Sequence, residues 1–189
     1  HWLEMLECEH GLGAGTIRVM PMITETAGAL LSLPSFTPSP PRVVAMTWGA
    51  EDLATELGAL GNRTSTGEYE PAFELARSLC LITAAAAGVL AIDTVDTEIR
   101  DIAAVEQRAR SSRRAGYLGK LAIHPAQIPA IHAAFTPAAA ELEWARRVLE
   151  AVAAAPAAGA VKVDGKLIDR PHVLQAERLL ASVAQAGRA

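Results

Sequence analysis

The sequence has 189 residues, of which 51% are hydrophobic and 20% are charged, and its formal net charge is -4. This length is enough for one domain with a hydrophobic core, and the weakly acidic charge gives no indication of a nucleic-acid-binding surface. The longest nearly apolar stretch, residues 79–92, is too short to cross a bilayer as a helix. Cys8 and Cys80 lack a metal-ligand spacing, so we expect reduced thiols and a cytoplasmic location.

The first 15 residues are a polar, weakly helical segment that ends in the glycine-rich sequence HGLGAG. The sequence opens with His1 rather than Met, as though it were entered midway through a structural element. We therefore expect residues 1–15 to be a partial opening element, and the chain to be a fragment or a processed product.

Strands and helices are expected to alternate between residues 16 and 135. Short β-branched or apolar runs predict strands at 17–23, 43–48, 89–93 and 117–123. Helical patterns follow each of them, at 26–33, 68–87 and 97–115 and from Pro125 onward. Four successive strand-helix units predict an α/β fold with a parallel sheet and right-handed crossovers.

After Phe135 the pattern changes. A helix is expected at 136–155, a hairpin at 161–168 around Asp164 and Gly165, and a last helix at 171–186. We interpret residues 136–189 as an appendage to the sheet.

Two acidic residues come directly after expected strands, Glu25 after the first and Asp52 after the second. Loops at the carboxyl ends of parallel strands commonly build the site of an α/β protein, and carboxylates are ligands that Mg2+ prefers. The structural alternative is that Glu25 caps the helix at Thr26 and Asp52 occupies the first turn of the next helix. Spacing alone favours this alternative.

Near Asp52, the small residues Gly49 and Ala50 could let backbone N–H groups approach an anionic substrate, or could simply form a strand-to-helix turn. Glu51 is either an outer ligand or an ordinary first-turn acid. Asp93 ends the third expected strand, where it could support the site or pair with Arg100.

Three further residues are candidates with clear structural alternatives. Lys120 could form a Schiff base if burial lowered its pKa, which makes a metal-independent aldolase an alternative function. The structural interpretation of Lys120 and His124 is a surface lysine and a turn histidine. Asp169 precedes the last helix, where an N-cap acid is the ordinary interpretation.

Several motifs together carry a family resemblance. In order along the chain they are ITETAGAL, WGAEDLATELG, AIDTV followed by RD, GYLGKLAIHPAQI, FTP with WARRVLEA, and DGKLIDRPHVLQAERLL. This series resembles the HpcH/HpaI aldolase and citrate lyase β-subunit group, which includes malyl-CoA and citramalyl-CoA lyases. The resemblance runs from about Ile17 to the last helix and covers the later half of the family's barrel.

The resemblance implies a partial (β/α)8 TIM barrel, in which residues 16–135 supply the later four βα units. Residues 136–189 would form a C-terminal helical lid and oligomerisation segment. A half barrel has two open strand edges, so we expect it to associate with another copy of itself or with a separately supplied N-terminal half.

The resemblance also implies roles for the candidate residues. Glu25 and Asp52 would bind Mg2+, with Mn2+ as a possible substitute, and the turn at Gly49 and Ala50 would contact a keto-acid carboxylate. Asp169 would reach the site of a neighbouring subunit and transfer a proton. The residues of GK and IHP, which include Lys120 and His124, would shape the site without forming an imine.

The implied reaction is reversible carbon-carbon cleavage of a β-hydroxyacyl-CoA of the malyl or citramalyl type. Its products would be glyoxylate or a keto acid and an acyl-CoA. The arginine that grips the keto-acid carboxylate in the family comes from early strands that this sequence lacks. We therefore expect the isolated chain to be inactive or nearly so, and a catalytically silent half-barrel assembly module is the alternative.

Overall fold

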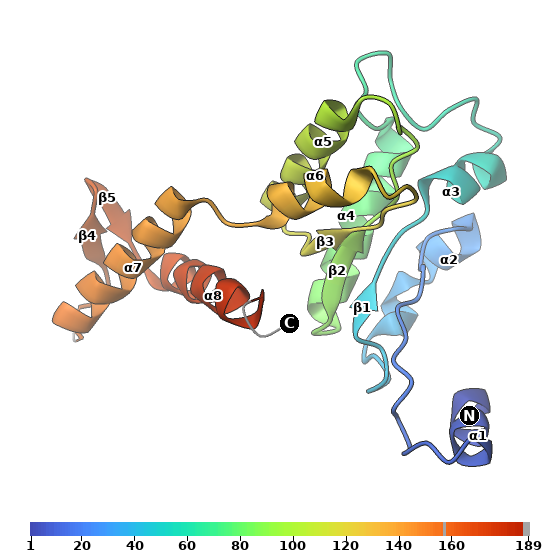
Figure 1. Cartoon of the computed structure of the whole chain (residues 1–189), viewed down its shortest axis with the longest axis horizontal. Helices are drawn as coiled ribbons and strands as arrows, with labels where there is room; N and C mark the ends of the chain where they lie inside the picture. The colour runs from blue at the N-terminus through green and yellow to red at the C-terminus, as the bar shows by residue number, and fades with distance from the viewer. Residues whose placement is uncertain (157, 187–189) are drawn as a thin grey trace. The chain divides into compact units, whose positions relative to one another are not determined.

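The computed structural model describes residues 1–156 and 158–186 and divides into two compact units, His1–Phe135 and Thr136–Ala189. Figure 1 shows the elements of both units. Those of the first unit are, in order, α1 (Trp2–Glu9), α2 (Ala27–Leu31), a 3-10 helix η1 (Leu33–Phe36), β1 (Ala45–Met46), α3 (Ala50–Leu57), α4 (Pro71–Ala86), β2 (Leu90–Asp93), α5 (Ile102–Ala115), β3 (Gly119–Lys120) and α6 (Gln127–Phe135).

The sheet of the first unit is parallel and has the strand order β1-β2-β3. Its register pairs Met46 with Ala91 and Asp93 with Lys120. The crossovers run through α3 and α4 and then through α5 (Figure 1). The structure thus confirms the α/β class with a parallel sheet, and in the described residues the sheet has three strands rather than four.

The segment predicted as the first strand, residues 17–23, runs beside β1 without forming a continuous strand. Two isolated parallel bridges join it to the β1 segment, Val19 with Val43 and Met22 with Thr47. Pro21 lies between these bridges and has no N–H group, so the hydrogen-bond ladder is interrupted there. Its carbonyl still accepts a hydrogen bond from the Thr47 N–H at 3.1 Å. The segment therefore keeps the direction of a strand up to Ile23, two residues before Glu25.

Two long helices begin later than their sequence patterns predict. Residues 68–70 lie in an extended connection, and α4 starts at Pro71, because proline is well suited to the first helical position. The α5 helix starts after Asp101, whose side chain accepts a hydrogen bond from the Ala104 N–H at 3.0 Å. It ends at Gly116, which has a φ of 115°.

The main hydrophobic core lies between the sheet and helices α3 and α4. Trp48 and Leu53 are fully buried there, with Phe73 from α4 and Tyr117 from the segment before β3. A smaller cluster joins α5 to α6 through Val105 and Ile131. This packing fixes the carboxyl ends of β1 and β2, which carry the candidate residues.

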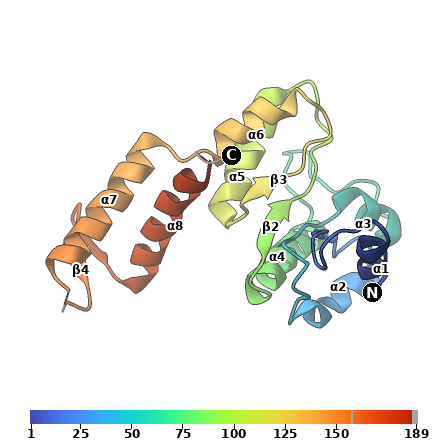
Figure 2. The ribbon, with the colours of Figure 1, turned by 60° about the horizontal axis from the view of Figure 1, so that its bottom comes forward.

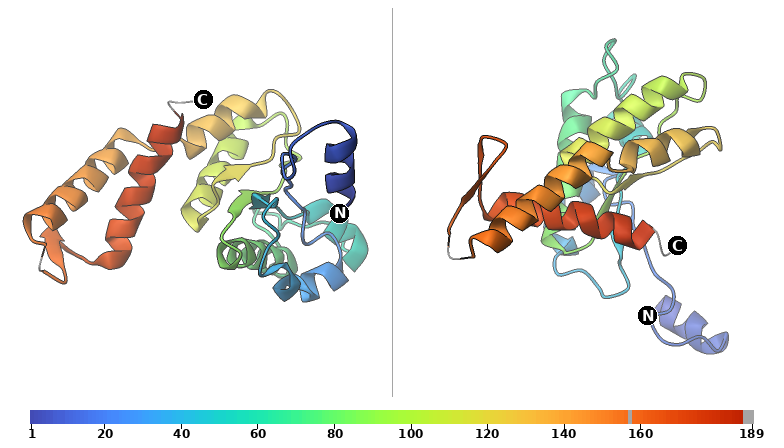
Figure 3. Two further views of the ribbon diagram at one scale, coloured as in Figure 1. Left: turned by 90° about the horizontal axis from the view of Figure 1, so that it is seen from below. Right: turned by 60° about the vertical axis from the view of Figure 1, so that its left-hand side comes forward.

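Helix α1 is tied to the rest of the first unit through the buried side chain of Glu7. Its carboxylate accepts hydrogen bonds from the N–H groups of Gly15 at 2.9 Å and Ile17 at 2.7 Å, and pairs with Arg42 at 2.9 Å. The hydrogen bond from Arg42 and those from the two backbone groups lower the pKa of Glu7 to about 2. Figure 3 shows α1 at the margin of the unit, away from the strands.

The second unit consists of α7 (Ala139–Ala154), the hairpin strands β4 (Val161–Val163) and β5 (Lys166–Ile168), and α8 (Arg170–Ala186). Asp164 and Gly165 both have positive φ, of 50° and 77°, as the predicted two-residue hairpin turn requires. The two helices lie side by side (Figure 2). Ala145 and Val148 of α7 form a core with Ile168 and with Ala176 of α8.

Among the described residues, no helix is long and apolar enough to cross a membrane. Residues 79–92, the longest nearly apolar stretch, are divided between α4 and β2.

Candidate functional site

Glu25 and Asp52 line the same cavity. Glu25 follows the segment that runs parallel to β1, and Asp52 lies in the first turn of α3, which begins after β1. The cavity has a volume of about 440 Å³, and its lining residues are Glu25, Thr26, Asp52, Thr55 and Glu56. The structure therefore brings together the two acids that the sequence placed after neighbouring strands. Glu56 was missed, although its position four residues after Asp52 puts it on the same face of α3.

The donor set of this cavity suits a hard divalent cation. No group of three or more His, Cys, Asp or Glu side chains in residues 1–156 and 158–186 is placed to hold a metal ion. Mg2+ needs fewer protein ligands, since it usually keeps several waters and takes one or two carboxylates together with substrate oxygens. Glu25 and Asp52 supply two carboxylates beside the Thr26 and Thr55 side chains, in a cavity with room for waters. The residues present therefore fit Mg2+.

The turn between β1 and α3 packs closely against Glu25. The Gly49 N–H donates a hydrogen bond to the buried Thr24 Oγ1 at 3.3 Å. A Cβ atom added at Gly49 would lie 2.7 Å from the Met22 Sδ and 3.0 Å from the Glu25 Cγ. An alanine at position 49 would therefore require the Met22 and Glu25 side chains to shift.

Gly49 is also the N-cap residue of α3 and has no side chain to cap the helix. The first N–H groups of a helix lack partners within the helix and favour an anion. The start of α3 at Ala50 can therefore receive an anionic oxygen beside Asp52.

Glu51 makes a structural contact. Its Oε1 accepts a hydrogen bond from the Asn62 Nδ2 at 2.7 Å, which ties α3 to the loop of residues 58–70. It is absent from the described lining of the Glu25 and Asp52 cavity.

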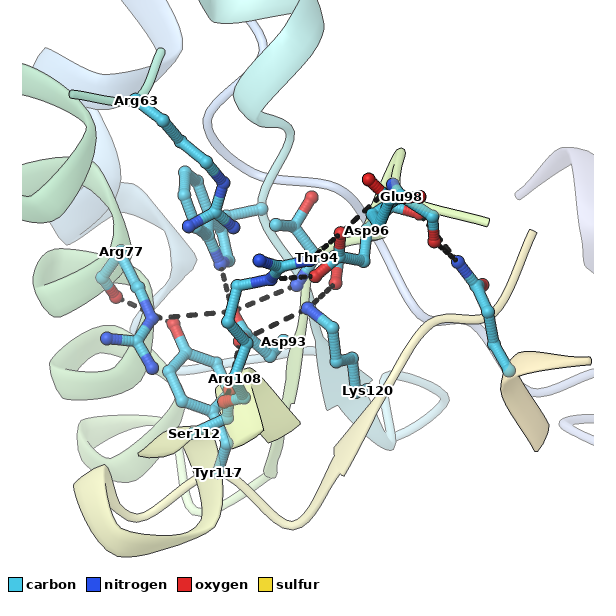
Figure 4. Close-up of polar contacts among 12 residues, drawn as sticks. Arg63, Arg77, Asp93, Thr94, Asp96, Glu98, Arg108, Ser112, Tyr117 and Lys120 are labelled. Carbon is cyan, nitrogen blue, oxygen red and sulfur yellow. Dashed lines mark hydrogen bonds and ion pairs between the residues drawn. The ribbon is translucent and has the colours of Figure 1, made fainter. Parts of the chain in front are cut away.

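Asp93 lies at the centre of a buried ionic network at the end of β2 (Figure 4). Its carboxylate accepts hydrogen bonds from the Trp48 Nε1 at 2.6 Å, from the Thr94 N–H at 3.0 Å and from the Ser112 hydroxyl. Arg77 and Lys120 flank it at 3.5 and 3.6 Å. We call Arg77, Asp93 and Lys120 the Asp93 cluster. The pairing is with Arg77 and Lys120 rather than with Arg100.

The charge of Asp93 is stabilised in place. Burial by itself raises the pKa of a carboxyl group, but the positive charges of Lys120 and Arg77 and the hydrogen bonds from Ser112 and Trp48 together hold the pKa of Asp93 below its usual value. Trp48 immediately precedes Gly49, so its hydrogen bond to Asp93 also holds in place the residue before the turn at Gly49.

Lys120 is not the surface lysine of the structural interpretation, since its side chain is only 1% exposed. Its Nζ donates a hydrogen bond to the Thr94 carbonyl at 2.7 Å and also faces Asp93. Burial holds the pKa of Lys120 below its usual value, and the neighbouring Asp93 and Asp96 offset this only in part. Lys120 does not line the Glu25 and Asp52 cavity.

His124 and Asp169 make local contacts. The exposed His124 accepts a hydrogen bond from the Ala126 N–H through Nδ1 at 3.1 Å, as expected for a turn histidine. Asp169 lies in the second unit just before α8, where its Oδ1 is 2.6 Å from the His172 Nδ1. Its side chain is about half exposed and therefore accessible to a ligand.

Sequence reasoning missed the arginines around Asp93 and Asp96. Arg108 binds Asp96 through two hydrogen bonds, of 2.6 and 3.0 Å, and Arg77 approaches Asp93 from α4. Pairs that lie on different elements leave no periodic signal in the sequence. The one available signal was the helical placement of Arg108 on the same face as Ser112.

Glu25 and Asp52 follow neighbouring parallel segments and line one cavity. The chain is therefore an α/β protein with a candidate site at the carboxyl ends of its strands. A family model described as HpcH/HpaI aldolase/citrate lyase matches residues 3–125. The chain belongs to the HpcH/HpaI aldolase/citrate lyase family.

Two similar curated proteins and one solved structure bear on the site. A citrate lyase subunit beta-like protein of Mycobacterium tuberculosis H37Rv is 35% identical over 164 residues, which are 87% of this chain and 59% of that protein. A (3S)-malyl-CoA thioesterase of Cereibacter sphaeroides KD131 is 34% identical over 162 residues, covering 83% and 54%. The crystal structure of CitE from M. tuberculosis with magnesium, acetoacetate and coenzyme A matches with a TM-score of 0.77 and 34% identity, covering 87% of this chain and 60% of that chain.

The chain therefore spans less than two thirds of the length of these relatives.

Proposed function

We propose that this chain carries the metal-binding part of a Mg2+-dependent carbon-carbon lyase that cleaves or forms a β-hydroxyacyl-CoA of the malyl or citramalyl type. The observation that carries the proposal is the shared cavity of Glu25 and Asp52, beside the uncapped start of α3. The solved relative with magnesium, acetoacetate and coenzyme A supports the same ligand classes.

The proposed roles follow from the geometry of the cavity. Glu25 and Asp52 hold Mg2+, which when bound would act as a Lewis acid toward the substrate's hydroxyl or keto oxygen. The N–H groups at Ala50 and Glu51 orient the carboxylate of the keto acid or glyoxylate. The role of Asp169 is taken from the family resemblance instead: at the site of a neighbouring subunit it would exchange a proton with the carbon beside the thioester.

Thioester hydrolysis is a second candidate reaction on the same class of substrate. One similar protein is named a malyl-CoA thioesterase, so hydrolysis of the thioester is a second candidate for the whole protein. Both reactions use the same acyl-CoA. Product analysis separates them, because only the lyase releases glyoxylate or a keto acid.

Magnesium binding tests the proposal directly. We expect Mg2+ to raise the thermal unfolding midpoint of the wild-type chain, because an ion that binds the folded state stabilises it. Glu25→Gln and Asp52→Asn should each remove this shift, since each deletes one of two carboxylate ligands. Glu74→Gln is the matched control, because Glu74 is also a first-turn acid, but of α4. It should keep the wild-type response.

A wild-type chain that does not respond to Mg2+ or Mn2+ would favour the alternative, a catalytically silent half-barrel assembly module.

The Schiff-base aldolase alternative is tested on the same protein by borohydride trapping. Borohydride treatment with pyruvate or glyoxylate should leave Lys120 unmodified, because its amino group is buried and engaged by Asp93 and Thr94. A reduced adduct on Lys120, found by peptide mass analysis, would contradict the metal mechanism.

We also propose that the chain associates with a second copy of itself or with a separate N-terminal half. Met20, Met22, Leu90 and Leu118 are exposed apolar side chains of the strand segments and the residues next to them. Such segments favour pairing with a second copy or with a separate N-terminal half. Sedimentation at increasing concentration should show oligomers. A chain that stays monomeric, folded and free of aggregation throughout would be evidence against association.

A further inference from the structure

A second cavity of the first unit lies beside the Asp93 cluster and is distinct from the Glu25 and Asp52 cavity. Its volume is about 520 Å³, and it is bounded by α4, α5, the ends of β2 and β3, and the loop of residues 63–69. The basic residues in its lining are Arg63, Arg77, Arg108 and Lys120, and hydroxyl groups come from Thr66, Ser111 and Ser112. None of its described lining residues belongs to the other cavity.

The deep part of this cavity has an excess of positive charge. Arg77 and Lys120 share the single carboxylate of Asp93, and Arg108 is matched by Asp96. Arg63 lies 3.8 Å above the ring of Tyr69 and donates a hydrogen bond to the Gly67 carbonyl at 2.8 Å. Four cations thus meet two buried carboxylates.

The other acids of the lining are less able to balance this charge. Glu68 is exposed, and the side chain of Glu74, which contacts Arg77 at 3.4 Å, is half exposed. Solvent screens such contacts strongly. Buried cations need counter-charges, because their removal from water is costly.

One buried donor in the cavity also lacks a hydrogen bond. The Arg77 Nε has no hydrogen-bond partner among the described contacts, although it lies 3.5 Å from the Asp93 Oδ1. The Arg77 side chain is 11% exposed, so water reaches it poorly. Figure 4 shows Arg63, Arg77 and Arg108 arranged around Asp93, with Lys120 on the side opposite Arg77.

We infer that this cavity binds a small phosphate-class dianion between Arg63, Arg77 and Arg108. Guanidinium groups suit phosphate because they offer planar, paired N–H donors, and the hydroxyl of Ser111 adds a further donor at the wall. Arg63 has no carboxylate partner among the described contacts, and the Arg77 Nε lacks a hydrogen bond, so these two groups have donor capacity for an anion. Asp93 stays bound by Trp48 and Ser112, so it is a fixed part of the wall.

The test is a titration of the whole chain with inorganic phosphate. Binding is measured by calorimetry and by thermal unfolding, and sodium chloride at equal ionic strength is the reference. We expect saturable binding and a rise of the unfolding midpoint on the order of 2–5 °C beyond chloride. Arg63→Gln should weaken the affinity about tenfold or more, because it removes a charged donor. Ser111→Ala is a second variant, which should weaken it less and which a helix tolerates well.

Arg110→Gln is the matched control. Arg110 lies on the same helix but pairs with Glu106 at 2.6 Å and is absent from the described lining of the cavity. It should bind phosphate like the wild type. The inference is overturned if phosphate has no effect beyond chloride, if Arg63→Gln binds as tightly as the wild type, or if succinate binds more tightly than phosphate.

Discussion

Replacement of Asp93 by alanine is expected to lower the free energy of unfolding by about 3–5 kcal/mol, because it leaves two cations buried without their carboxylate. Arg77 and Lys120 approach Asp93 at 3.5 and 3.6 Å, and the Lys120 side chain is only 1% exposed. The substitution also leaves the Trp48 indole N–H without its acceptor. Urea unfolding monitored by tryptophan fluorescence measures the change.

Glu143→Ala is the control for this experiment. Glu143 also pairs with two arginines, Arg146 and Arg147, but on the exposed surface of α7. Its loss should change stability by less than about 1 kcal/mol. Asp93→Asn should have an intermediate effect, since an amide can still accept from Trp48. If Asp93→Ala were as stable as the control, the network would have no structural role.

The same network gives a pH dependence with a definite sign. Because the pKa of Asp93 is held below its ordinary 3.8, the carboxylate's contribution is present at neutral pH and down to that value. It is lost as the pH falls further, toward the pKa of the folded state. The difference in stability between the wild type and Asp93→Asn should therefore shrink in acid.

The second large effect is expected for Gly49→Ala, which should reduce or abolish the Mg2+ response. The added Cβ would lie 3.0 Å from the Glu25 Cγ and 2.7 Å from the Met22 Sδ, so both side chains must move. Overpacking of a closed core costs about 1–3 kcal/mol of stability, and we expect a smaller loss here because Met22 is an exposed, flexible side chain. The Mg2+-induced shift of the unfolding midpoint and the midpoint without metal are the two measurements.

Gly28→Ala is the matched control, because no atom lies within 4 Å of the added Cβ and Gly28 is within helix α2. It should keep the metal response and should raise stability by roughly 0.5–1 kcal/mol, since alanine favours the helix. Adding Met22→Ala to Gly49→Ala should restore part of the response by making room. A full metal response in Gly49→Ala would show that the close packing at Gly49 does not set the position of Glu25 for metal binding.

The sequence was most informative where structure depends on neighbouring residues. The hairpin at Asp164 and Gly165 and the acids Glu25 and Asp52 were located by turn chemistry and by their position after apolar runs. Pro21 shows the limit of that reasoning, because an apolar run predicts a strand while the missing N–H interrupts it. The half barrel stays a prediction, since the described sheet has three strands.

Contacts between distant elements could not be read from the sequence. Pairing with Arg100, seven residues later, was one of two interpretations of Asp93, whereas its partners come from α4 and β3. A surface lysine was one interpretation of Lys120, whereas the strand register pairs it with the buried Asp93. Such pairings depend on which helix packs on which strand, and hydrophobic periodicity does not encode this.

Two consecutive residues that follow β1, Trp48 and Gly49, contact two different candidate sites. Trp48 donates to Asp93 of the ionic network, and Gly49 donates to Thr24 next to Glu25. Engineering either site by changing this pair will therefore disturb the other, so altered metal affinity and altered stability should appear together in random mutant libraries. Substitutions intended to tune only one property are better placed on α3 or α5, each of which lines a single one of the two cavities.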